Sequence, residues 1–474
     1  MNYEIKKILD DNVVKYSSDA FIFEKHNNTW QSKSYGDFTH DVKNFAAFLQ
    51  HENLAHKKIA IYAANSYNYL VCDAAIMAYV GISVTISKEW TAFDLDNSMR
   101  KIKYDAIIYD TPRADIVAEI QSKFPDLKSF KIEEINTSNN YDLDEDLINC
   151  DDVSKIVFSS GTTGTPKAVM LTQRNMLVNF ENLNRRAPMS HADVDYLFLP
   201  LSHTYASISN FMSVLITGMR LYLCSDIKQI ATEIQEVKPT IFCAVPLIFE
   251  RFYQASKEQN INPKTLFGGQ IRHLFAGGAH MDTKIIQYFK QHHTGLLNTY
   301  GLSETSAIVA VEYHNEDDFD SDGTIFENIE VKIDQPDDDG VGEILVRGEN
   351  VTPGYYNNPE LTKQAIDEDD FFHTGDLGKI IDQKIYVKGR KKRVILLSNG
   401  ENIYPDDIEP LLEKYEHVNK AKVYEKNHQI FAMLYCDEII DLEPIIENVN
   451  LELPKYSRIQ GFDQKLDQIG TRIK

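Results

Sequence analysis

A nine-residue loop between two apolar segments constrains the fold of this chain more than any other feature. Seven of its nine residues are Ser, Thr or Gly, and the string reads Ser159-Ser160-Gly161-Thr162-Thr163-Gly164-Thr165-Pro166-Lys167. The flanking segments, 156–158 and 168–171, are each predicted to form a short strand. Glycines let the backbone approach an anion, hydroxyl and N–H groups can surround it, and the terminal lysine adds a point charge. The string therefore predicts a polyphosphate-binding loop.

The spacing of this loop differs from that of two common nucleotide-binding loops. A Walker loop requires G-x-x-x-x-G-K-[ST], whereas Gly164 follows Gly161 by three residues and Ala168 replaces the hydroxyl expected after Lys167. The Rossmann string G-x-G-x-x-G does not fit either. An ordinary Gly- and Thr-rich turn is the alternative for any three of these residues, but it explains the whole string poorly.

Length and charge limit the classes of protein that this chain can represent. A chain of 474 residues is too long for one ordinary domain, so we expect two or three. The 71 acidic and 49 basic residues give a net charge of −22, which argues against a partner that is nucleic acid or an anionic membrane. A nucleotide ligand would therefore depend on local positive charge.

Cysteine usage and hydropathy point to a cytoplasmic protein without a membrane segment. The five cysteines are scattered and include no C-x-x-C pair, which fits a reducing compartment and argues against zinc. The N-terminus has no long apolar stretch of the signal-peptide type. The most apolar segment, 69–86, contains Asp73 and Gly81. It is predicted as a buried helix that leads into a strand, not as a membrane span.

Alternating elements in the first part of the chain predict an α/β fold. Strand-like and helix-like segments follow one another on the plan of a parallel sheet with helices on its faces. The predicted strands are 58–62, 82–86 and 106–109, and the predicted helices are 38–52 and 69–79.

A strand-rich region and a basic run mark the remainder of the chain. Residues 323–388 are rich in short strands and turns and are predicted to form a small β-barrel. A basic run at 389–393 follows in an otherwise acidic protein. We therefore expect a large N-terminal domain at 1–391, with multiple layers, and a small mobile α+β domain at 392–474.

Five further strings occur in a fixed order after the loop. Each has an ordinary structural explanation by itself, such as a turn or a helix cap. They are Leu199-Pro200-Leu201-Ser202-His203-Thr204-Tyr205, Ala276-Gly277-Gly278-Ala279, Asn298-Thr299-Tyr300-Gly301-Leu302-Ser303-Glu304-Thr305, Phe372-His373-Thr374-Gly375-Asp376 and Gly389-Arg390-Lys391-Lys392. Together with the loop they form a set whose resemblance to a known family extends over nearly the whole chain. The set resembles the ANL superfamily of adenylating enzymes, and its strings are most similar to those of AMP-forming fatty acyl-CoA synthetases.

The resemblance implies a site for ATP and Mg²⁺. The loop would hold the β and γ phosphates, Glu304 and Ser159 would hold Mg²⁺, and Asp376 would accept hydrogen bonds from the ribose hydroxyls. Lys392 would be the hinge between the domains. The residues implied in ATP or AMP binding are Ser159, Ser160, Gly161, Thr162, Thr163, Gly164, Thr165, Lys167, Gly277, Gly278, Ala279, Thr299, Tyr300, Gly301, Ser303, Asp376 and Arg390.

The resemblance also implies a carboxylic acid as substrate. His203 would lie near the acid's carboxylate and the adenylate. Peptide-synthetase domains place an aspartate just beyond this histidine to pair with a substrate ammonium, and the comparable position here is Ala206. Because a buried ammonium without a counter-charge is costly, we expect a plain carboxylic acid, by family analogy a fatty acid. Its apolar lining is expected from Phe211, Val214, Cys243, Ala244 and Val245.

The end of the chain departs from the family pattern. Relatives end with a Thr-Gly-Lys-like string whose lysine stabilises the adenylation transition state, whereas this chain ends Gly470-Thr471-Arg472-Ile473-Lys474. Arg472 takes the lysine's place without a gap, and Lys474 takes it with a small shift, so both are candidates. Residues 398–405 resemble the loop that approaches the pantetheine thiol.

Three functions are compatible with these features. The first is acid activation followed by transfer to CoA. The second is the same activation with transfer to the pantetheine of an acyl carrier protein. The third is a catalytically weakened protein that binds a nucleotide or an acyl-adenylate, which the unusual C-terminus motivates.

Overall fold

The computed structural model of the chain describes residues 3–159, 166–313, 318–396, 402–426, 429–453 and 457–466. The chain divides into two compact units by its internal contacts. The first contains Met1–Val331 and Val346–Phe372, and the second contains Lys332–Leu345 and His373–Lys474. The two units are defined by the density of contacts within each of them, whereas the boundary predicted at Lys392 is the point about which one domain would rotate. That boundary therefore stays a prediction. None of the described helices is long and apolar enough to cross a membrane.

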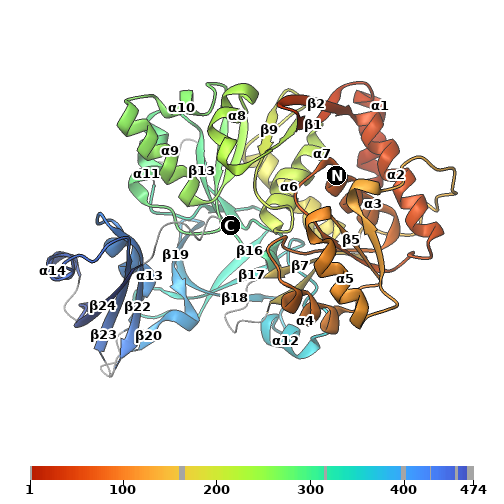
Figure 1. The fold of residues 1–474 in the computed structure, drawn as a ribbon. Helices are drawn as coiled ribbons and strands as arrows, with labels where there is room; N and C mark the ends of the chain where they lie inside the picture. The colour runs from red at the N-terminus through yellow and green to blue at the C-terminus, as the bar shows by residue number, and fades with distance from the viewer. Residues whose placement is uncertain are drawn as a thin grey trace. The chain divides into compact units, whose positions relative to one another are not determined.

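A six-stranded sheet in the first unit contains the two strands that flank the predicted phosphate loop, β7 and β8. Two of its strands, β5 and β7, are labelled in Figure 1. Its order is β6-β5-β3-β4-β7-β8, and its pairs are parallel except for the antiparallel pair of β7 and β8. Ser159 lies opposite Lys167 in that pair, so the loop connects two hydrogen-bonded strand ends. The strands are β3 (Lys58–Tyr62), β4 (Ile82–Thr85), β5 (Ala106–Tyr109), β6 (Lys128–Lys131), β7 (Val153–Ser159) and β8 (Lys167–Thr172).

A second sheet in the first unit presents the ends of three strands to the predicted motifs. β11, β12 and β13 run parallel, and the strings at 277–279 and 301–305 directly follow β12 and β13. Ligands of open α/β sheets bind beyond such carboxyl ends. The strands are β1 (Ala20–His26), β2 (Thr29–Ser34), β9 (Val194–Leu197), β10 (Arg220–Leu223), β11 (Ile241–Ala244), β12 (His273–Ala276), β13 (Leu296–Tyr300), β14 (Ala310–Val311) and β15 (Thr324–Ile325).

The helices of the first unit cover these sheets. Their starts are often set by side-chain caps: Thr172 accepts from the backbone N–H of Asn175 and closes a capping box at the start of α6. The helices are α1 (Ile5–Tyr16), α2 (Tyr35–His51), α3 (Tyr67–Ala75), η1 (Ile76–Val80), α4 (Ala92–Ile102), η2 (Thr111–Arg113), α5 (Ala114–Lys123), η3 (Ile132–Glu134), α6 (Gln173–Arg186), η4 (Tyr205–Met212), α7 (Ser213–Thr217), η5 (Ile227–Gln229), α8 (Ile230–Val237), α9 (Pro246–Gln259), α10 (Pro263–Leu266), α11 (Thr283–Gln291), η6 (Ser303–Thr305) and α12 (Pro359–Ala365).

The second unit contains the strand-rich region and a small α+β part. Strands β16, β17, β18 and β19 lie side by side in one sheet, in the same order as in the sequence. Strands β22, β23 and β24 form a separate three-stranded sheet. α13 and α14 pack on that sheet around buried Ile408, Leu412 and Val449. The elements are β16 (Glu330–Asp334), β17 (Gly342–Arg347), β18 (Phe372–Ile381), β19 (Lys384–Arg390), η7 (Lys391–Arg393), β20 (Ile395–Leu396), β21 (Asn402–Ile403), α13 (Pro405–Glu413), β22 (Val418–Lys426), β23 (Gln429–Cys436), α14 (Glu443–Glu452) and β24 (Gly461–Leu466).

Candidate active site

Glu304 is the centre of a hydrogen-bonded cluster in the first unit. Its Oε1 accepts from the Ser159 hydroxyl at 3.1 Å and from the Tyr355 hydroxyl at 3.0 Å. The ammonium of Lys167 lies 3.4 Å from the same Tyr355 oxygen and 5.0 Å from the centre of its ring. Both described ends of the predicted phosphate loop are therefore linked to Glu304, Ser159 directly and Lys167 through Tyr355. The central residues of that loop, 160–165, lie outside the described residues.

Amide side chains fix the backbone around Glu304. Asn179 of α6 donates to the carbonyls of Thr305 and Ile308 at 3.2 and 2.6 Å, and Asn350 donates to the Thr305 carbonyl at 3.1 Å. The Glu304 carbonyl accepts from the Thr352 N–H at 2.8 Å. The short helix η6 is thus held by groups that are distant in sequence, which limits the position of the carboxylate.

The chemistry of this cluster fits a hard divalent cation. Burial, followed by the charge and hydrogen bond of Glu304, raises the pKa of Tyr355 far above its ordinary value, so this phenol stays a donor at neutral pH. Glu304 and Ser159 place a carboxylate and a hydroxyl oxygen side by side, and Mg²⁺ prefers oxygen ligands. The two residues predicted to hold Mg²⁺ are therefore adjacent.

The histidine motif reaches the same region through a neighbour. His203 precedes η4, and its carbonyl accepts from the Ser207 N–H at 3.0 Å. The hydroxyls of Thr204 and Ser303 lie 3.2 Å apart, which links the residues after His203 and before Glu304. His203 is an exposed residue, but desolvation by the protein around it disfavours the charged imidazole and lowers its pKa. At neutral pH it is uncharged and can donate one N–H.

Close packing explains two of the predicted glycines. A Cβ on Gly277 would lie 2.3 Å from the Thr299 hydroxyl oxygen and 3.4 Å from Cζ of Tyr205, and one on Gly301 would lie 2.1 Å from the Ala307 carbonyl oxygen. Gly278 and Ala279 are exposed. Tyr300, expected to stack on adenine, is only 8% exposed, and its stacking role stays a prediction.

We expect Gly277→Ala to raise the KM for ATP about tenfold by displacing Thr299. Thr299 cannot move freely because its hydroxyl donates to the Ala276 carbonyl at 2.9 Å. Initial-rate kinetics of adenylation would measure the change. Adding Thr299→Ala should restore part of the loss, with Thr299→Ala alone as the baseline. A wild-type KM in Gly277→Ala would contradict this account.

The second unit brings together two other predicted residues. Asp376 and Arg390 are partners across β18 and β19, and Nε of Arg390 lies 2.7 Å from Oδ1 of Asp376. Lys392, the expected hinge, is exposed within η7. Arg472, Lys474 and residues 398–401 of the predicted thiol loop at 398–405 lie outside the described residues, and their roles stay predictions.

The sequence arguments missed several contributors to these clusters. Tyr355 lies outside the predicted strings, and nothing in its local sequence pointed to its contact with Glu304. Thr204 lies directly beside the predicted histidine. Asp195 has no motif: it is 1% exposed on β9, and it lies next to Cys243 of the expected acid lining.

Asp195 is expected to make the protein less stable as the pH rises. Burial raises the pKa of Asp195 to about 7, although the hydrogen bond that Asn210 donates at 2.9 Å lowers it in part. In the unfolded chain the same carboxyl has a pKa near 3.8. Between these values the folded state binds the extra proton, so its stability is full at low pH and declines as pH rises through 7. Asp195→Asn should therefore gain on the order of a few kcal/mol over wild type at pH 8 and little near pH 4.

Chemical denaturation at several pH values would test this difference. Asp193→Asn is the matched control, since hydrogen bonds from Thr240, Ser190 and Arg272 outweigh burial and lower the pKa of Asp193. That variant should lose stability at neutral pH. If the difference in stability between Asp195→Asn and wild type does not vary with pH, Asp195 does not titrate in this way.

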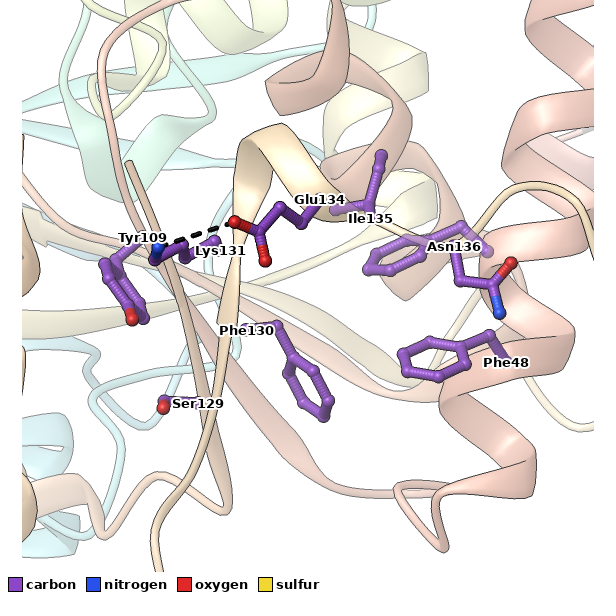
Figure 2. A pocket seen from close by; sticks show the side chains of 9 residues that line it. Phe48, Tyr109, Ser129, Phe130, Lys131, Glu134, Ile135 and Asn136 are labelled. Carbon is purple, nitrogen blue, oxygen red and sulfur yellow. Dashed lines mark hydrogen bonds and ion pairs between the residues drawn. The ribbon is translucent and has the colours of Figure 1, made fainter. Parts of the chain in front are cut away.

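A separate cavity of about 290 Å³ lies elsewhere in the first unit (Figure 2). Its walls come from α2, the ends of β5 and β6, and the segment around η3, and Lys131 pairs with Glu134 at its rim at 3.4 Å. None of the residues that line it is among the predicted site residues.

Comparisons with known proteins agree with the arrangement. A family model described as "AMP-binding enzyme" matches residues 9–356. The 2-succinylbenzoate–CoA ligase of Staphylococcus epidermidis is 26% identical over 395 residues, covering 82% of this chain and 79% of that protein. The long-chain-fatty-acid–CoA ligase FadD15 of Mycobacterium bovis is 25% identical over 437 residues, covering 78% and 71%. The solved O-succinylbenzoate CoA synthetase of Bacillus subtilis, in complex with AMP, has the same fold, with a TM-score of 0.84 at 19% identity over 97% of this chain and 94% of that one.

Proposed function

Because the chain belongs to the AMP-binding enzyme family, we propose that it is an AMP-forming ligase that activates a carboxylic acid and transfers it to CoA. The observation that carries this proposal is the meeting of Ser159, Lys167 and Glu304, three groups suited to polyphosphate and its cation. His203 is joined to the same region through Thr204 and Ser303. The relatives named as CoA ligases support the choice of CoA as acceptor.

In the first step, a carboxylate oxygen of the acid attacks the α-phosphorus of ATP, and the bond to pyrophosphate breaks. The neutral imidazole of His203 donates to the acid and orients it, and Lys167 neutralises part of the phosphate charge. Glu304 and Ser159 would hold Mg²⁺, which supplies further positive charge at the phosphates. Asp376 and Arg390 bind the ribose side of the nucleotide.

In the second step, the thiol of CoA loses its proton and its sulfur attacks the carbonyl carbon of the acyl-adenylate. The bond to AMP breaks, so the products are a thioester and AMP. We propose that a rotation at Lys392 changes the site from the first step to the second. Arg472 or Lys474 serves the first step in place of the family lysine.

We propose a fatty acid as the substrate. A relative named as a long-chain-fatty-acid–CoA ligase supports this choice. Four residues of the expected lining, Phe211, Val214, Cys243 and Ala244, are apolar and lie in the core of the first unit. An aromatic acid is the second candidate, because one of the relatives acts on succinylbenzoate by name.

ATP–pyrophosphate exchange with a panel of acids would test the function. The panel should contain fatty acids of several lengths and 2-succinylbenzoate, and each active acid should then be offered CoA or an acyl carrier protein. Exchange with a fatty acid and thioester formation on CoA are expected. ATP binding without exchange for any acid would leave only the weakened, nucleotide-binding function.

A further inference from the structure

One carboxylate in the second unit contacts both the turn before Asp376 and the residue before Lys392. Glu343 lies on β17 and is 7% exposed. Its Oε1 accepts from the backbone N–H of Gly375 at 3.0 Å, and its Oε2 lies 2.7 Å from the ammonium of Lys391. Gly375 directly precedes the predicted ribose ligand, and Lys391 directly precedes the predicted hinge.

The turn at Gly375 depends on this contact. Gly375 has φ +73°, a left-handed conformation that places its N–H toward β17. The neighbouring Thr374 hydroxyl donates to the Ile344 carbonyl at 2.7 Å and accepts from the Asp376 N–H at 3.0 Å. Two consecutive residues of β17 therefore fix the backbone from which the Asp376 carboxylate extends.

The charges around Glu343 explain why Lys391 is held there. Asp334, Glu343 and His373 offer ligand atoms within 4.8 Å of one another, a grouping that could suit a metal ion. The Lys391 ammonium, however, already supplies a cation in direct contact with Glu343. Burial alone would raise the pKa of Glu343, but the hydrogen bonds from Lys391 and His373 keep that pKa below its ordinary value. Glu343 is therefore a carboxylate at neutral pH.

We propose that Glu343 is a positioning residue for ATP, and that it holds Asp376 through Gly375 and the hinge segment through Lys391. This inference rests on the proposed function, in which Asp376 binds the ribose. Glu343 does not need to touch the nucleotide. Its removal frees the turn that carries Asp376 and, at the same time, releases the residue beside Lys392.

Kinetics of the full-length protein would test this role. Glu343→Ala should raise the KM for ATP about tenfold, as a weaker form of the effect of Asp376→Ala, while the KM for the acid stays within about twofold of wild type. The control is Glu330→Gln, which breaks an exposed ion pair of the same kind with Arg347. That variant should leave both constants unchanged.

A double-mutant cycle would separate the two contacts of Glu343. Glu343→Gln keeps an oxygen that can accept from Gly375 but loses the charge that holds Lys391, so its effect should match that of Lys391→Met. The double variant should be no worse than either single one. Additive effects would show that Glu343 and Lys391 act separately and would overturn the proposed link to the hinge.

The outcomes also distinguish this inference from the proposed function. ATP binding would be followed by calorimetry beside pyrophosphate exchange, and thermal melting would show whether each variant folds. If wild type binds ATP and exchanges pyrophosphate while a folded Glu343→Ala keeps the wild-type KM for ATP, the inference is wrong and the function stands. If wild type neither binds ATP nor supports exchange, both are wrong.

Discussion

Glu304→Gln is expected to slow acyl-adenylate formation by about 10²- to 10³-fold without unfolding the protein. Glutamine has nearly the same size as glutamate, and its oxygen can still accept from the Ser159 and Tyr355 hydroxyls, which lie 3.1 and 3.0 Å from the carboxylate. It lacks the negative charge that would hold Mg²⁺ beside the phosphates. ATP–pyrophosphate exchange at saturating ATP would measure the rate.

The dependence on Mg²⁺ identifies the cause of this loss. Glu304→Gln should need a much higher Mg²⁺ concentration for half-maximal exchange than wild type. Tyr355→Phe removes one donor and keeps the carboxylate, so its rate should fall by about tenfold or less with nearly wild-type Mg²⁺ dependence. An unchanged Mg²⁺ dependence in Glu304→Gln would mean that Glu304 holds no metal.

Lys155→Met is expected to lower the free energy of unfolding by about 3–5 kcal/mol. The ammonium of Lys155 lies 2.8 and 2.7 Å from the two carboxylate oxygens of Asp73, and both side chains have no solvent exposure. Ser83 donates to the same carboxylate at 2.6 Å. Without Lys155 the Asp73 charge is buried and uncompensated, so it must take up a proton or open the structure. Denaturant titration would measure the loss.

Replacing both partners by apolar residues gives the control. Asp73→Leu with Lys155→Met removes the two charges together and should recover much of the stability lost in Lys155→Met, because no isolated charge remains. A double variant no more stable than Lys155→Met would show that an uncompensated Asp73 charge does not cause the loss. The expected ordering would show that loss of the partner, not loss of the lysine's volume, causes the effect.

Local patterns predicted much of the fold. The strands predicted at 58–62 and 106–109 agree with β3 and β5. Alternation of short apolar runs with helices was enough to predict a parallel sheet, because each element buries one face and the connection between neighbours is short. The segment predicted as one helix at 69–79 consists of α3 and the π-helix η1, since apolar spacing does not fix the hydrogen-bond register.

Contacts between residues that are distant along the chain could not be predicted from the sequence. The ends of the loop, Ser159 and Lys167, were identified from residue types, but their contacts with Glu304 and Tyr355 join residues up to 188 positions apart. Lys155 interrupts an apolar strand, and its pairing with Asp73 depends on α3 packing against β7. Glu343 likewise has no motif of its own, because its role comes from two backbone segments that meet only in the folded protein.

The ion pair of Asp376 and Arg390 has a consequence for selectivity among nucleotides. The charges of Asp376 and Arg390 neutralise each other at 2.7 Å. On the proposed function, a ribose must therefore compete with an internal partner for the Asp376 carboxylate. The affinity for the nucleotide then depends on how much stronger the hydrogen bonds from ribose are than the ion pair that they replace. On that proposal, a sugar that lacks one hydroxyl offers the carboxylate less than the arginine does, so the ion pair would favour ribonucleotides over deoxyribonucleotides.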